Sequence, residues 1–162
     1  MEKNTWKVDP AHSRVGFKIK HLGIADVSGY FSDFTVEVSH SEPDYSDIAI
    51  EVKINAASIN TGIDMRDNHL RSADFFDVEK HPQITFSKTK IEKLDENKGR
   101  LSGELTLLGI TKPIELDTTY YGTVTNPMTQ EDTVGFKITG NINRKDFALG
   151  TGFESNFIAD KV

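Results

Sequence analysis

The sequence predicts an all-β protein whose antiparallel strands form a sandwich or a barrel, and three observations support this. Apolar and polar residues alternate with period two through most of the chain. Short polar segments rich in turn-forming residues separate the alternating stretches. One irregular region, residues 64–86, interrupts the pattern with charged residues, two histidines and a Phe pair. Loops on a rigid sheet commonly carry function, so we expect this region to hold the protein's specificity.

The alternation predicts half-buried strands that each have one apolar face and one polar face. Turns are expected at 42–47, 95–99, 109–113 and 126–132, which contain Pro, Gly, Asn or Asp. Seven or eight strands with short polar connections are typical of a sandwich or a barrel. An eight-stranded barrel can be filled by its own side chains or can hold one small ligand. In chain order, the strands are expected around Val15, Phe17 and Ile19; Phe34, Val36 and Val38; Ile48, Ile50, Val52 and Ile54; Ile84 and Phe86; residues 101–107; Ile114, Leu116 and Tyr120; and Phe136, Ile138 and Ile142.

Only residues 64–77 have helical character. This stretch contains residues spaced by three to five, as on one helix face: Met65, His69, Leu70, Ala73 and Phe76. Asp64 stands where a side chain could cap the first turn. The sequence therefore predicts one short helical segment in an otherwise β protein.

Composition restricts the partners and the cellular compartment. The 162 residues predict a single domain over 1–162, and 19 basic against 25 acidic residues give a net charge of −6. Since nucleic-acid binding depends on clustered Lys and Arg, no nucleic-acid partner is expected. No apolar run has the length of a membrane-spanning helix. The first ten residues lack the apolar core of a signal peptide, so a cytoplasmic location is expected, or a periplasmic or secreted one if a signal was removed.

Sequence signatures of catalysis and metal binding are absent. The chain has no nucleophile elbow, zinc-protease helix, phosphate-binding loop or dinucleotide fingerprint. His12 and Ser13 could join a triad with some Asp, but the many Ser and Asp residues make such a grouping unspecific. The five histidines fit no standard ligand spacing, and there is no cysteine. We expect no catalytic residue, no metal and no cofactor.

Several long motifs resemble the YceI-like family. They are W-x-V-D-P-A-H-S at 6–13, F-K-I-K-H-L-G at 17–23, G-Y-F at 29–31, R-D-N-H-L-R-S-A-D-F-F-D at 66–77, P-x-I-T-F at 82–86, L-T-L-L-G-I-T-K-P at 105–113 and G-N-I-N-R-K-D-F at 140–147. The resemblance implies an eight-stranded lipocalin-like antiparallel barrel, with a helix near one end, around a long apolar tunnel. It also implies non-catalytic binding, transport or storage of a polyisoprenoid or related long-chain amphiphile, such as an isoprenoid-quinone precursor or a fatty amide.

By position, the resemblance assigns side chains to the tunnel and to its mouth. Arg66, Asp67, His69 and Asp74 are candidates for meeting a polar head group or for tying the helix to the barrel, and the second role is favoured for each. The tunnel lining is expected from the barrel residues Phe17, Ile19, Phe31, Phe34, Val36, Ile50, Val52, Phe86, Leu105, Leu107 and Phe136, and from the helical segment through Met65, Leu70, Phe75 and Phe76.

The C-terminus departs from the family pattern. The chain stops at Val162, about where the family's last strand begins. A barrel without that strand has two open edges, so we expect a shortened sequence or a partner at the seam, a homodimer included. Two other functions remain open: an enzyme acting on a lipid or isoprenoid-quinone precursor, with His69 and Asp67 as acid–base groups, and a stress-related interaction module that uses the exposed edge.

Overall fold

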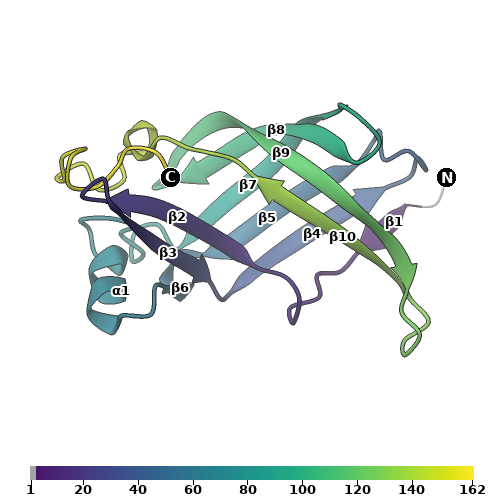
Figure 1. Cartoon of the computed structure of the whole chain (residues 1–162), viewed down its shortest axis with the longest axis horizontal. Helices are drawn as coiled ribbons and strands as arrows, with labels where there is room; N and C mark the ends of the chain where they lie inside the picture. Colours follow the sequence, from purple (N-terminus) through teal and green to yellow (C-terminus); the bar gives the residue numbers. More distant parts are fainter. Residues whose placement is uncertain (1–2) are drawn as a thin grey trace.

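The protein, described by a computed structural model over residues 3–162, consists of two antiparallel sheets and one α-helix (Figure 1). The helix α1 spans Asp64–Arg71, and two 3-10 turns, η1 and η2, span Ala56–Ser58 and Arg144–Phe147. The smaller sheet has the order β2 (Val15–His21), β3 (Ala25–Phe31) and β6 (Ile59–Asn60). The larger sheet has the order β1 (Asn4–Trp6), β4 (Phe34–His40), β5 (Ala49–Asn55), β7 (Gln83–Lys93), β8 (Lys98–Leu107), β9 (Ile110–Thr125) and β10 (Asp132–Thr139). The predicted all-β, lipocalin-like class with one short helix is confirmed.

The larger sheet curls until its two edge strands approach each other, which makes it a half-barrel (Figure 1). Across the residues described, no ladder of hydrogen bonds joins β1 to β10. The edges meet through side chains, because the Trp6 indole of β1 stacks on the Phe136 ring of β10 with centroids 5.5 Å apart. The small sheet and α1 lie at the end of the half-barrel that is away from β1 (Figure 1). We call the region where the edge strands β1 and β10 meet the seam.

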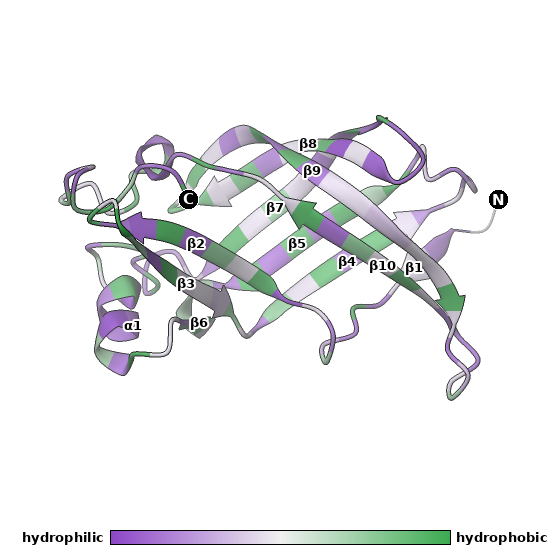
Figure 2. Ribbon diagram, viewed as in Figure 1, coloured by the Kyte–Doolittle hydropathy of each residue, from purple (hydrophilic) through white to green (hydrophobic). Residues whose placement is uncertain are grey.

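The strands alternate in burial as their sequences predict. Along β2 the residues switch between half-buried and exposed at every position, with Phe17 and Ile19 on the half-buried side. Figure 2 shows the same alternation as changing hydropathy along each ribbon. Since side chains on one strand point alternately to the two faces of a sheet, the apolar residues of β2, β4 and β5 lie together on the covered face of their strands.

Two buried clusters pack the inner face, one toward each end. The first gathers small-sheet, α1-segment and C-terminal residues, with Phe31, Ile59, Phe75 and Phe147 among its members. The second consists of Ile48, Ile50, Phe86 and Leu101, with Trp6 packed against it. Val52, Leu105 and Ile114 contact both clusters and are only half buried. The middle of the inner face is thus less tightly covered than its ends.

Several strand boundaries differ from the sequence expectation. β1, β3 and β6 were not predicted, because two are very short and β3 contains Ser28 and Gly29 within its pattern. The expected turn at 109–113 is shorter, since Leu108 and Gly109 alone adopt positive φ and β9 begins at Ile110. Ile142 lies outside β10, and its backbone pairs with Val162 instead.

The helix is shorter than predicted and begins differently. It ends at Arg71, because Ser72 adopts extended backbone angles and its hydroxyl donates to the His69 carbonyl at 2.6 Å. Residues 72–80 continue as turns. Asp64 is the first helical residue and not the cap, while Ile63 occupies the cap position without a side-chain hydrogen bond. The negatively charged Asp64 carboxylate still stabilises α1, because it lies at the positive, N-terminal end of the helix dipole.

Gly103 on β8 gives room to the Phe86 ring on the neighbouring strand. A Cβ added at Gly103 would overlap that ring and would lie 2.5 Å from the Ser87 carbonyl oxygen. We expect Gly103→Ala to lower the free energy of unfolding by about 1–3 kcal/mol, the range for overpacking. Urea denaturation measures this. Gly152→Ala is the control, because a Cβ there meets nothing within 4 Å; equal stability of the two variants would contradict the packing argument.

Candidate functional site

An apolar row crosses the middle of the inner face. Val36 of β4, Val52 of β5, Phe86 of β7 and Leu105 of β8 are consecutive partners in strand register. Phe86 is buried, and the other three side chains keep part of their surface exposed although they point inward. All four belong to the predicted lining. We call these four residues the floor of the inner face. They form a continuous apolar surface that a ligand could contact, and none of the four is charged.

The remaining predicted barrel residues flank this floor. Phe17 and Ile19 of β2 are half buried, and Phe17 packs 5.8 Å from the buried Phe31 of β3, centroid to centroid. Phe34 is half buried next to the floor, whereas Ile50 and Leu107 are buried, each in one of the two clusters. Phe136 stands at the seam with 41% of its surface exposed.

Aromatic side chains close the α1 end of the half-barrel. Phe75 stacks on Phe153 at 5.0 Å, and Phe153 in turn stacks on Phe157 at 6.0 Å. Phe76 meets Phe31 edge to face, and Leu70 packs against the same cluster. Met65, by contrast, points to solvent with 83% exposure. Of the four predicted lining residues in this segment, three therefore pack at the end wall and Met65 does not.

The charged side chains of α1 contact the loop before the helix and the turns after it. Asp67 is 4% exposed and accepts hydrogen bonds from the Thr61 backbone N–H, at 2.8 Å, and from the Thr61 hydroxyl. Arg66 donates to the Thr61 hydroxyl and carbonyl, each at 2.7 Å. His69 Nε2 lies 2.8 Å from Asp74 Oδ2. These contacts tie α1 to the preceding loop, and His69 pairs with Asp74 and not with Asp67.

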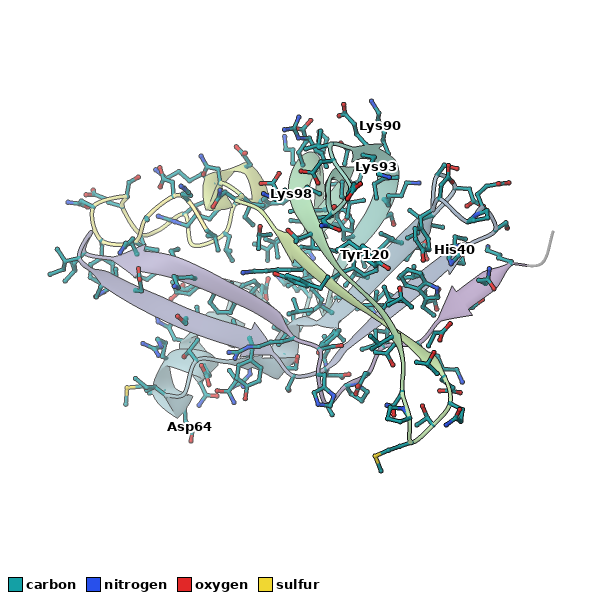
Figure 3. The ribbon with its side chains drawn as sticks, turned by 45° about the vertical axis from the view of Figure 1, so that its right-hand side comes forward. His40, Asp64, Lys90, Lys93, Lys98 and Tyr120 are labelled. Carbon is teal, nitrogen blue, oxygen red and sulfur yellow. The ribbon has the colours of Figure 1, made fainter. Side chains whose placement is uncertain are left out.

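A second set of side chains, of which the sequence analysis assigned only Phe136 to the lining, surrounds Trp6 at the other end. Trp6 packs edge to face on His40 at 5.3 Å and on Tyr45 at 5.5 Å, besides stacking on Phe136. Tyr120 of β9 lies 5.4 Å from Phe136. His40 and Tyr120 are found at this end, far from Asp64 of α1 (Figure 3). We call Trp6, His40, Tyr45, Tyr120 and Phe136 the seam cluster.

One member of the seam cluster, His40, could have been recognised from the sequence as an inward-facing residue. Phe34, Val36, Val38 and His40 share the same parity on β4, so His40 continues the inward face and is 8% exposed. Its proximity to Trp6 was not predictable, because 34 residues separate the two in the chain.

The loop after β4 is held by its own carboxylates. Asp47 accepts hydrogen bonds from the backbone N–H groups of Ser41, at 2.8 Å, and Glu42, at 3.0 Å. The Glu42 N–H is the main cause that lowers the pKa of Asp47 below 3.8. The Ser46 backbone N–H likewise lowers the pKa of Asp44 below 3.8. Both carboxylates therefore stay ionised at neutral and mildly acidic pH.

Two surface hollows lie away from the apolar row. One, of about 330 Å³, is lined by residues 112–115 of β9, 141–143 and 146–147. The other, of about 370 Å³, lies against Thr89 of β7, residues 102–104 of β8 and residues 113–115 of β9. Neither touches a predicted lining residue. Over residues 3–162, no group of three or more His, Asp or Glu side chains is arranged to hold a metal ion. In the same range, no helix is long and apolar enough to cross a membrane.

Comparison with known proteins identifies the family. A model described as YceI-like domain matches residues 6–162. The chain belongs to the YceI-like family. One YceI-like relative, the UPF0312 protein ECA1782 of Pectobacterium atrosepticum, is 40% identical over 140 residues, which cover 86% of this chain and 72% of that protein.

Solved YceI-like structures share the architecture. The YceI protein of Campylobacter jejuni is 37% identical, with a TM-score of 0.80 over 97% of this chain and 91% of that one. A polyisoprenoid binding domain from Saccharophagus degradans is 15% identical, with a TM-score of 0.58 over 91% of this chain and 87% of that one. This second likeness is one of fold alone. The predicted family is confirmed, and membership in it favours a binding protein over a catalyst.

Proposed function

We propose that this YceI-like protein binds a polyisoprenoid or a related long-chain amphiphilic lipid without chemical conversion, and transports or stores it. The observation that carries the proposal is the in-register apolar row Val36–Val52–Phe86–Leu105, in which Phe86 is buried while the other three inward-pointing side chains remain partly exposed. An apolar surface that faces the inside of a curled sheet and is not fully covered suits a flexible hydrocarbon chain. Each CH₂ that leaves water for such a surface gains about 0.8 kcal/mol.

A solved structure of similar fold is named for the same ligand class. The Saccharophagus degradans domain of similar fold is named for polyisoprenoid binding. An isoprenoid chain needs no specific polar partner along its length, which agrees with a floor built from Val, Phe and Leu. The polar groups of the α1 segment and the seam cluster are the places where a head group would be recognised.

A catalytic function has weaker support. The acid–base pair considered from the sequence, His69 with Asp67, is not formed, because Asp67 is bound to Thr61 and His69 to Asp74. Single residues near a surface do not define a reaction, so we infer a carrier and no enzyme.

The test is direct identification of a bound lipid. The protein is purified without detergent from a bacterial host and extracted with organic solvent, and the extract is analysed by mass spectrometry. We expect the extract to contain one lipid class with a long isoprenoid or acyl chain, at about one lipid molecule per protein chain. A titration with a neutral fluorescent isoprenoid, geranylgeraniol bearing a nitrobenzoxadiazole label, is expected to show saturable binding. An empty extract together with no saturable binding would contradict the proposal.

A further inference from the structure

The seam cluster contains a histidine whose two ring nitrogens are both engaged. Trp6 Nε1–H lies 3.2 Å from His40 Nε2, and His40 Nδ1 lies 3.1 Å from the Glu42 carbonyl oxygen. An indole nitrogen can only donate a hydrogen bond and a carbonyl can only accept one. Hence His40 is neutral in this arrangement, with its proton on Nδ1 and its lone pair on Nε2 facing the indole.

A second proton on this ring removes the contact with Trp6. Protonated His40 would carry N–H groups at both nitrogens, so its Nε2–H would oppose the Trp6 N–H. Two donors at hydrogen-bond distance repel, and His40 is too buried for water to take the place of the indole without movement. Imidazole is the side chain that commonly changes charge between about pH 5 and 8.

The titratable and charged groups near His40 come from its own loop and from β7, β1 and β10. Its own loop contributes Glu42, Asp44, Tyr45 and Asp47, and the two aspartates remain ionised for the reasons given above. From β7, the Lys88 ammonium donates to the Ile48 carbonyl at the end of the same loop. From β1, Trp6 contacts the His40 ring, Asn4 is the register partner of His40, and Lys3 and Lys7 flank the strand. From β10, Phe136 lies behind Trp6 and is followed by Lys137. Within the part of the chain that is described, no ion pair to His40 is formed.

Trp6 is also the side chain that joins the two edges of the half-barrel. It reaches from β1 to Phe136 of β10, where no backbone ladder holds the edges together in residues 3–162. β1 itself has three residues and pairs only with β4. A three-residue edge strand has few hydrogen bonds of its own, so release of Trp6 frees the edge on which it sits.

We propose that the Trp6–His40 hydrogen bond is a proton-sensitive latch on the seam: while His40 is neutral the seam is closed, and protonation of His40 releases Trp6 and opens the inner apolar face. The consequence, which rests on the proposed lipid function, is that the protein releases its lipid faster at mildly acidic pH. The lipid would then enter and leave through the seam.

The experiment follows Trp6, the single tryptophan of the chain, in the ligand-free protein. Its emission and its indole N–H proton resonance are recorded from pH 8 to pH 5. We expect both signals to change in one transition. Over the same range, the release rate of the labelled geranylgeraniol, which is uncharged at every pH used, is expected to rise at least fivefold.

Two variants assign the transition to one residue. In His40→Gln, an amide can accept from Trp6 at every pH, so both the indole transition and the rise in release rate are expected to disappear. In His12→Gln, which alters a side chain that is 83% exposed and bound to Asp9, both are expected to persist. If His40→Gln does not fold, by circular dichroism, the wild-type indole resonance still decides whether the Trp6 hydrogen bond is lost on acidification.

Three results would overturn the latch: an indole resonance that stays constant down to pH 5, a transition that survives in His40→Gln, or a transition without any change in release rate. Failure of the lipid function gives a different result. It shows as no probe binding at pH 8, where the seam is closed, whatever the indole signal does on acidification.

Discussion

Val52→Asp is expected to weaken binding of the labelled geranylgeraniol by more than about 100-fold. Val52 lies in the centre of the apolar row, between Val36 and Phe86, and contacts both buried clusters. A carboxylate there would have to stay hydrated or be buried against the bound chain, and an unpaired buried charge costs several kcal/mol. Since about 1.4 kcal/mol corresponds to a factor of ten, two orders of magnitude are a conservative expectation. Fluorescence titration at pH 8 measures the affinity.

The matched control lies one residue further along β5. Lys53 is exposed on the outer face of the same strand, so Lys53→Asp is expected to change the affinity by less than about threefold. Circular dichroism establishes whether each variant folds. If Val52→Asp unfolds, Val52→Phe tests the same floor without charge, by filling the space above Phe86, and at least tenfold weaker binding is expected. Normal binding by a folded Val52 variant would mean that the ligand lies elsewhere.

Arg144→Ala is expected to lower the free energy of unfolding by about 3–5 kcal/mol. Arg144 is 1% exposed, and its five guanidinium donors are all used on backbone carbonyls. Its carboxylate partner, Asp160, is 3.7 Å away and partly exposed. Removing a fully bonded buried charge leaves its acceptors without partners, which is among the most destabilising of single substitutions. The carbonyls belong to Ala159, Leu149, Gly150, Phe153 and Ile158.

Chemical denaturation compares this variant with Arg144→Lys and Arg100→Ala. Arg144→Lys is expected to recover little of the loss, because an ammonium has three donors and cannot reproduce the planar five-donor geometry. Arg100 is exposed on β8, so Arg100→Ala is expected to stay within about 0.5 kcal/mol of the wild type. A small effect of Arg144→Ala would show that the C-terminal loops hold together without it.

The apolar faces of the strands were predictable because their cause is local. Successive side chains in a strand point to opposite faces, so the alternation around Val36, Val52 and Phe17 specifies which residues face inward before any contact is known. The motifs of the α1 segment were equally visible, although the helix ends at Arg71 because of a Ser72 hydroxyl contact that no periodicity encodes. The fold class and the family therefore followed from short-range pattern and motif order.

The seam and the C-terminal network depend on contacts between residues far apart in the chain. The curl of the large sheet, which brings Phe136 to Trp6, results from strand twist and packing summed over seven strands. The tautomer of His40 follows from a tryptophan 34 residues away. The sequence showed Arg144 only as part of a family motif, and its burial, with 1% of its surface exposed, appears in the tertiary structure alone.

By itself, then, the sequence determined that this is an all-β YceI-like protein with apolar inner strand faces, because side-chain alternation and motif order are properties of the chain. Only the tertiary structure decided that the faces form a half-barrel with an incompletely covered floor. It alone also decided that Arg66 and Asp67 of α1 are bound to the preceding loop, and that Trp6, held by the buried His40, meets Phe136 across the two edges. Those features depend on which distant strands become neighbours, and that is settled by packing in three dimensions.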